Sequence, residues 1–170
     1  MNKLTLYLIF LTMTTMIHGY DRLTGESFAS RSEVIGQNGM VATSHPLATQ
    51  IGLDTLKNGG NAIDAAIAAN IALGLMEPTG NGIGGDLFAI VWSAKDKMLY
   101  GLNASGPAPQ DISIDYIKSK GLKKIPSFGP LPVSVPGAVD GWIKLHERFG
   151  NIDFENLFEP TIKYALEAVS

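Results

Sequence analysis

The glycines between residues 80 and 85 have the spacing of a nucleotide-binding loop. Gly80, Gly82 and Gly85 spell G-x-G-x-x-G, which in dinucleotide-binding proteins follows a strand and opens a helix. Here a helical, alanine-rich pattern at 62–76 precedes the glycines and a β-type run at 87–92 follows them. This reversed order excludes dinucleotide binding. Two interpretations remain: the loop shapes a substrate pocket, or glycine only lets a helix turn tightly into a strand.

Few other residues in the chain are of types that commonly carry out catalysis or bind metals. The chain has no cysteine, so a disulfide, a thiol nucleophile and a thiolate metal site are excluded. His18, His45 and His146 stand far apart without carboxylates at ligand spacing, and we expect no metal site. A net charge of -3 argues against a nucleic-acid partner, which would require a basic face. The composition therefore argues against thiol chemistry, a metal site and a nucleic-acid partner.

The first half of the chain predicts two helices, over 47–57 and 62–76. Ser44 is the expected cap of the first helix, assisted by His45, and Asn61 is the expected cap of the second. The second helix contains six alanines and is apolar nearly all round. A helix of that kind is buried.

Two strands are predicted over 86–93 and 98–103, around a polar turn at 94–97. The first strand is apolar on both faces, which indicates a position inside a layered structure, covered on both sides. Three further segments follow: an extended, proline-marked connector over 126–136, a helix between Gly137 and Gly150, and helical residues from Asp153 onward, the last of them at 161–170. The local pattern alone predicts a mixed α and β fold.

The N-terminus has the layout of a secretory signal peptide. Lys3 precedes a nearly uncharged run over 4–17. This run of fourteen residues is shorter than the roughly eighteen of a membrane-spanning helix, although a permanent anchor is the alternative. We therefore expect a signal peptide over 1–19, a flexible lead-in over 20–38, a domain over 39–170, and a periplasmic or secreted location.

Five segments in a fixed order resemble one enzyme family. They are GMVATSHPLA at 39–48, NGGNAIDAA at 58–66, EPTGNGIGGD at 77–86, NASGPAP at 103–109 and VPGA at 135–138. Together they resemble the N-terminal part of the large subunit of γ-glutamyltransferases (γ-glutamyltranspeptidases). The resemblance implies an α+β fold, an αββα sandwich of the N-terminal-nucleophile hydrolase type. The sandwich would be incomplete in this chain, and its apolar strands would then leave an exposed patch.

The resemblance also implies a mechanism. Members are made as precursors that cut themselves, and the N-terminal threonine of the new small subunit is both nucleophile and, through its α-amino group, general base. No matching threonine segment exists here, so no catalytic residue is assigned to this chain. The small subunit of the same precursor is the implied protein partner, and no cofactor is implied.

One substrate contact of the family falls within the chain. Typical members carry Asn-Ala-Arg-Glu-x-Ala-Pro at the strand end, and the arginine grips the substrate α-carboxylate. Here Ser105 occupies the arginine position, within Asn103-Ala104-Ser105-Gly106-Pro107-Ala108-Pro109. Serine offers one neutral hydrogen bond in place of a bidentate charged pair. Either the acyl specificity is altered, or another arginine compensates, or Ser105 is only a turn residue.

Three hypotheses about function follow from these residues. The first is an N-terminal fragment of an exported enzyme that hydrolyses glutathione or other γ-glutamyl amides and transfers the acyl group. The second is a branch of the family that hydrolyses other amides because Ser105 replaces the arginine. The third is a non-catalytic remnant or binding module.

Overall fold

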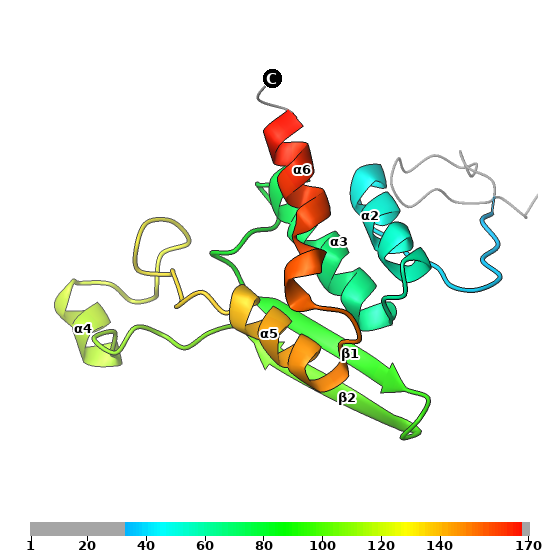
Figure 1. Cartoon of the computed structure of the whole chain (residues 1–170). Coiled ribbons are helices and arrows are strands. Elements are labelled where there is room, and N and C mark those ends of the chain that lie inside the picture. The colour runs from blue at the N-terminus through cyan, green and yellow to red at the C-terminus, as the bar shows by residue number, and fades with distance from the viewer. Residues whose placement is uncertain (1–32, 168–170) are drawn as a thin grey trace, which may run out of the picture. The chain divides into compact units, whose positions relative to one another are not determined.

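The computed structural model describes residues 33–167 and divides the chain into two compact units, 1–38 and 39–170. The predicted signal peptide over 1–19 and most of the predicted lead-in over 20–38 lie outside the described residues. The second unit contains, in order, α2 (Pro46–Lys57), α3 (Ala62–Met76), β1 (Leu87–Ser93), β2 (Met98–Ala104), α4 (Ile114–Ser119), α5 (Ala138–Phe149), the 3-10 helix η1 (Phe154–Leu157) and α6 (Glu159–Glu167) (Figure 1).

Helices α2 and α3 are each capped by the side chain of the residue before the helix. His45 caps α2, because its ring Nδ1 accepts a hydrogen bond from the Leu47 N–H at 3.3 Å. The prediction that Ser44 is the cap is wrong: its hydroxyl donates instead to the carboxylate of Glu77, 33 residues further along the chain. Asn61 caps α3 as predicted, and the Asp64 carboxylate completes a capping box with the Asn61 N–H.

The core is built around α3. Its buried residues pack against α2, α5 and η1, and the fully buried aliphatic side chains include Ile67 and Leu157. Burial is not complete around the helix, since Leu75 near its C-terminal end is exposed. The prediction of a buried helix therefore holds in part, because seven of its 15 residues are buried. The cluster of buried core residues is Ala48, Ile51, Ile67, Ala68, Ile71, Ala72, Trp142, Leu145 and Leu157.

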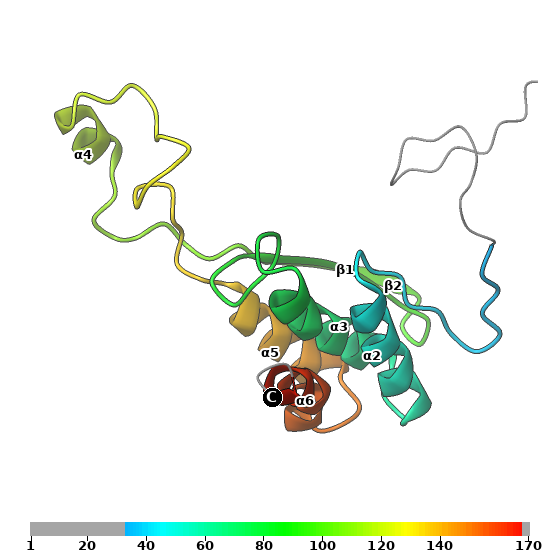
Figure 2. The same cartoon turned by 90° about the horizontal axis from the view of Figure 1, so that it is seen from above.

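The two strands form an antiparallel hairpin in which one face is covered and the other is bare. Leu87 pairs with Ala104 and Ala89 with Leu102, and this face packs on the core. Figure 2 shows the hairpin nearly edge-on with the labelled helices α2, α3, α5 and α6 on one side. The opposite face carries apolar side chains that stay largely exposed, namely Phe88 at 68%, Ile90 at 80% and Trp92 at 60%, together with Leu99 opposite Trp92.

The exposed face of the hairpin bears on two predictions of the sequence analysis. The covering that we predicted on both sides of β1 is present on one side only within residues 33–167. The exposed apolar patch is the outcome expected of an incomplete layered domain. We call Phe88, Ile90, Trp92 and Leu99 the bare sheet face below.

The remaining elements differ from the predictions in detail. The connector between β2 and α5 carries a short helix, α4, which the sequence analysis did not predict and which Figure 1 and Figure 2 place apart from the other helices. α5 begins after Gly137 and ends before Gly150, as predicted. Asp153 precedes the short 3-10 helix η1, and α6 starts at Glu159 rather than at residue 161.

A buried carboxylate joins α3 to the loop after α5. Asp64 is 0% exposed and accepts hydrogen bonds from the backbone N–H groups of Asn61, at 2.8 Å, and Asn151, at 3.1 Å. The Asn61 side chain donates to the Phe149 carbonyl at 2.6 Å, and the Asn151 side chain donates to the Gly59 carbonyl at 2.8 Å. These bonds fix the C-terminal end of α5 and thereby orient the whole helix.

Candidate functional site

Ser105 lies where the backbone after β2 packs closely against the backbone before α5. Gly106 has a positive φ of 71°, and a Cβ atom built there would collide with the Val135 carbonyl. A Cβ atom at Gly137 would collide with the Ala104 carbonyl. The Val135 N–H donates to the Pro107 carbonyl at 3.0 Å. Glycine at both positions therefore lets the residues after β2 lie directly against the residues before α5.

The glycine-rich loop 80–85 is joined to the same end of the hairpin. The Gly85 carbonyl accepts hydrogen bonds from the Gly137 and Ala138 N–H groups, both at 3.0 Å. None of the glycines at 80–85 has a positive φ, and a Cβ atom at Gly82 would meet no atom within 4 Å among the described residues. A tight turn therefore does not by itself require glycine at Gly82, which keeps the pocket-shaping interpretation of this loop open.

The crossing creates an open groove of about 530 Å³ that contains Ser105. Its walls come from the end of β2, the segment before α5 and the first two turns of α5. The lining residues are Asn103, Ala104, Ser105, Gly106, Pro107, Val135, Pro136, Gly137, Asp140 and Lys144. The groove is therefore of mixed polarity, and its few polar side chains could orient a ligand.

Ser105 is half-buried in this groove. Its N–H donates to the Asn103 side-chain oxygen at 3.0 Å, which fixes the backbone immediately after β2. The structure thus places the residue predicted to contact substrate at the wall of a groove.

A charged pair faces the same groove from α5. Lys144 lies one helical turn after Asp140, and its Nζ contacts an Asp140 carboxylate oxygen at 2.5 Å. Both side chains are more than half exposed, at 56% and 58%. The sequence analysis did not single out these residues, although their i, i+4 spacing on a predicted helix was a signal of a surface pair.

No arginine replaces the missing one within residues 33–167. Arg148 is the one arginine in this range. Its guanidinium stacks on the rings of Tyr100, at 4.3 Å, and Phe149, at 5.2 Å. Tyr100 pairs with Val91 in the middle of the hairpin, whereas Ser105 follows its end. The interpretation that another arginine compensates at this groove therefore has no support from the described residues.

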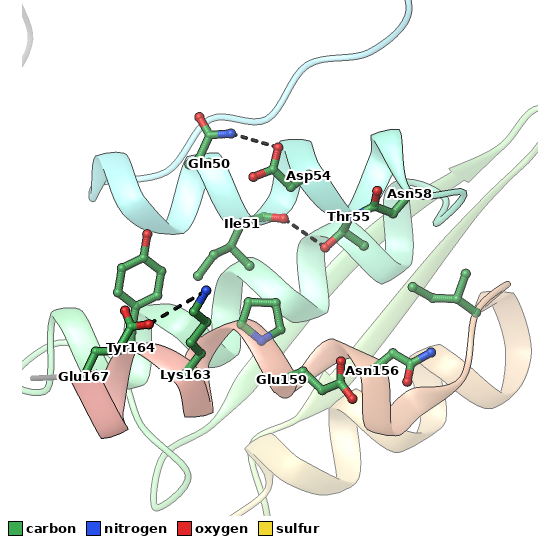
Figure 3. A pocket seen from close by; sticks show the side chains of 12 residues that line it. Gln50, Ile51, Asp54, Thr55, Asn58, Asn156, Glu159, Lys163, Tyr164 and Glu167 are labelled. Carbon is green, nitrogen blue, oxygen red and sulfur yellow. Dashed lines mark hydrogen bonds and ion pairs between the residues drawn. The ribbon is translucent and has the colours of Figure 1, made fainter.

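A second cavity, of about 490 Å³, lies between α2 and the η1–α6 segment (Figure 3). Two pairs of its polar side chains contact each other: Gln50 donates to Asp54 at 2.8 Å, and Lys163 lies 3.8 Å from Glu167. The hydrogen bond from Gln50, followed by the bond and the charge of Lys57, holds the pKa of the Asp54 carboxyl below its ordinary value. Each of these pairs lies along one helix, as is usual for a solvated helix surface, so we do not assign this cavity as the functional site.

No cluster of three histidine, cysteine or acidic side chains is placed to hold a metal ion within residues 33–167. None of the helices in the same range is long and apolar enough to cross a membrane.

Comparison with known proteins decides the family. The sequence profile described as Gamma-glutamyltranspeptidase matches residues 48–169. The chain belongs to the gamma-glutamyltranspeptidase family. It is 39% identical over 135 residues to the glutathione hydrolase proenzyme of Bacillus subtilis, an alignment that covers 77% of this chain and 23% of that protein.

Solved structures of gamma-glutamyltranspeptidase relatives resemble the described fold. A cephalosporin acylase from Bacillus halodurans is 48% identical, with a TM-score of 0.76 over 88% of this chain and 28% of that chain. The gamma-glutamyltranspeptidase of Helicobacter pylori is 32% identical, with a TM-score of 0.71 over 78% of this chain and 38% of that chain. The chain spans about a quarter of the length of the curated relatives it matches.

Proposed function

We propose that the chain is the N-terminal part of the large subunit of an exported amidohydrolase of the gamma-glutamyltranspeptidase family. Its Ser105 groove would receive part of the acyl group of an amide substrate. The single observation that carries this proposal is the position of Ser105: it follows β2 and lines a groove, at the place where typical members carry the substrate-binding arginine. The short share of each relative that the chain covers supports the proposal that further segments belong to it.

The proposed reaction is acyl transfer through a threonine supplied by those further segments. The threonine hydroxyl oxygen attacks the amide carbonyl carbon, and its proton passes through the threonine α-amino group to the departing amine. The C–N bond breaks and an acyl ester forms. Water or an amino group then attacks the ester, takes the acyl group and returns the proton to the threonine. The residues of the present chain bind and orient the acyl group.

We also propose that the bare sheet face packs against a second sheet from the later part of the precursor, which would complete an αββα sandwich of the N-terminal-nucleophile hydrolase type. Strands that are apolar on both faces lie between two covering layers. Exposed contiguous apolar surface of this kind marks a site of packing or association. The sandwich would place the end of β2 beside the small subunit.

The substrate of the proposed enzyme is not limited to γ-glutamyl amides. Without the arginine, the α-carboxylate of a γ-glutamyl donor loses a charge-assisted pair of about 1.5–3 kcal/mol. A relative whose structure is known is named a cephalosporin acylase, and it has 48% identity to this chain. We therefore propose that γ-glutamyl donors are handled weakly and that amides lacking the α-carboxylate are accepted without this loss.

Kinetics of the protein made from the full reading frame test this proposal. Ser105→Arg should raise kcat/KM for a γ-glutamyl anilide by about tenfold to a hundredfold, since 1.4 kcal/mol corresponds to a factor of ten. It should leave a carboxylate-free acyl anilide unimproved. Ser127→Arg is the matched control, because it adds the same charge at an exposed position of the same connector but outside the groove.

The possible results separate the hypotheses. Strong γ-glutamyl activity in the unmodified enzyme that Ser105→Arg does not improve would refute the assigned role of Ser105. Absence of any amide hydrolysis by the full-frame protein would favour the non-catalytic remnant or binding module.

A further inference from the structure

The groove at Ser105 contains one pair of opposite charges and no other charged side chain among the described residues that line it. Asp140 and Lys144 supply this pair from the first two turns of α5, and the rest of the lining is neutral. A groove with one positive and one negative group of this kind is complementary to a ligand that carries both charges close together.

The Asp140–Lys144 pair is free to exchange partners. An exposed pair at i, i+4 spacing contributes little to stability, so opening it costs little. Lysine carries its charge on a flexible four-carbon stem and can reach a ligand without backbone movement. Arg148, by contrast, stacks on the rings of Tyr100 and Phe149, away from the groove. Lys144 is therefore the cation of the described chain that is available to the groove.

We propose that Lys144 and Asp140 form the specificity-determining pair for a zwitterionic α-amino-acid head of the substrate, with Lys144 binding its carboxylate and Asp140 its ammonium group. This inference rests on the function proposed above and names the substrate feature that the groove selects. A lysine makes a point-charge contact where arginine would make a bidentate one, so the hold on the carboxylate is weaker than an arginine would give. In this proposal a residue of α5 binds the carboxylate, whereas in typical members an arginine at the end of β2 binds it.

The experiment measures ligand binding rather than turnover. The protein made from the full reading frame is titrated calorimetrically with L-glutamate and with L-isoglutamine, in which the α-carboxylate is replaced by an amide. The unmodified protein should bind glutamate about tenfold more tightly, within the range of a charge-assisted contact. Lys144→Gln should remove this difference by weakening glutamate alone. Asp140→Asn should weaken both ligands, because both carry the ammonium group.

Lys163→Gln is the matched control. Lys163 is an exposed lysine in an i, i+4 pair with Glu167 on α6, outside the groove. This variant should retain the preference for glutamate, and circular dichroism of all three variants should show unchanged helix content. Raised salt should reduce the glutamate preference of the unmodified protein, since the groove is open to solvent.

The results distinguish this inference from the proposed function. Hydrolysis of acyl anilides together with glutamate binding that does not depend on Lys144 would overturn the inference and leave the function standing. Binding of glutamate that depends on Lys144, without hydrolysis of any amide, would support the pair and refute the function. No preference for glutamate over isoglutamine in the unmodified protein would overturn the inference directly.

Discussion

Replacement of Ile90 by lysine should have opposite consequences in the isolated chain and in the complete protein. Ile90 lies at the centre of the bare sheet face and is 80% exposed. Complete burial of a large apolar side chain stabilises by about 1.5–3 kcal/mol, so burial of the mostly exposed Phe88, Ile90, Trp92 and Leu99 would contribute on the order of 4–8 kcal/mol. This sum is comparable with the roughly 5–15 kcal/mol that stabilises a whole protein.

In the 170-residue chain, Ile90→Lys replaces an exposed apolar group with a charge. It should leave the free energy of unfolding almost unchanged and reduce self-association, because the exposed patch becomes smaller. In the complete protein the same lysine would be buried between layers without a partner. Loss of the isoleucine burial and desolvation of the charge should then cost at least about 3 kcal/mol and abolish activity.

Light scattering after size-exclusion chromatography measures the first effect, and urea denaturation with an amide-hydrolysis assay measures the second. Ile114→Lys is the matched control, since Ile114 is an isoleucine of similar exposure, 74%, on α4. It should change neither property appreciably in the complete protein. If Ile90→Lys is as harmless there as Ile114→Lys, no second layer covers this face, and the layered arrangement is refuted. We also expect the isolated 170-residue chain to be poorly stable, because this face lacks a covering layer. A soluble monomer with sharp cooperative melting would contradict that expectation.

Three further outcomes are expected. Asp64→Asn should lower the free energy of unfolding by ~2–4 kcal/mol in urea titrations, because its new NH₂ group faces backbone donors and the buried charge is lost; unchanged stability would show that the network is dispensable. Gly106→Ala should weaken ligand binding in calorimetry, because the added Cβ atom collides with the Val135 carbonyl and displaces the groove wall; unaltered affinity would place the ligand elsewhere. N-terminal sequencing of the exported protein should begin near residue 20, and an intact Met1 on a cytoplasmic product would refute the predicted signal peptide.

The elements that the sequence predicted well are those with local signals. Asn61 caps α3 through bonds to residues two and three positions away, and Gly150 stops α5. The hairpin follows from two β-type runs around a polar turn. Helix α4 also had a local signal, because Ser113 caps it with a bond to the Tyr116 N–H at 3.1 Å, but a helix of six residues leaves no clear periodicity.

The features that the sequence did not reveal depend on contacts between distant residues. Ser44 does not cap α2 because it bonds Glu77, 33 positions away. The groove exists because Gly106 crosses Val135, and a single sequence does not show that these two segments meet. Ser105 was found only through its place in a family motif, and Lys144 enters the site only once α5 is packed against the end of β2.

The most direct test of the account is the intact mass and N-terminal sequence of the polypeptides obtained when the full reading frame is expressed and purified. We predict two chains produced by self-cleavage, the larger containing residues 39–170 and the smaller beginning with threonine. A single uncleaved polypeptide, or a frame that ends at Ser170, would contradict the proposal that this chain is part of a self-processing amidohydrolase.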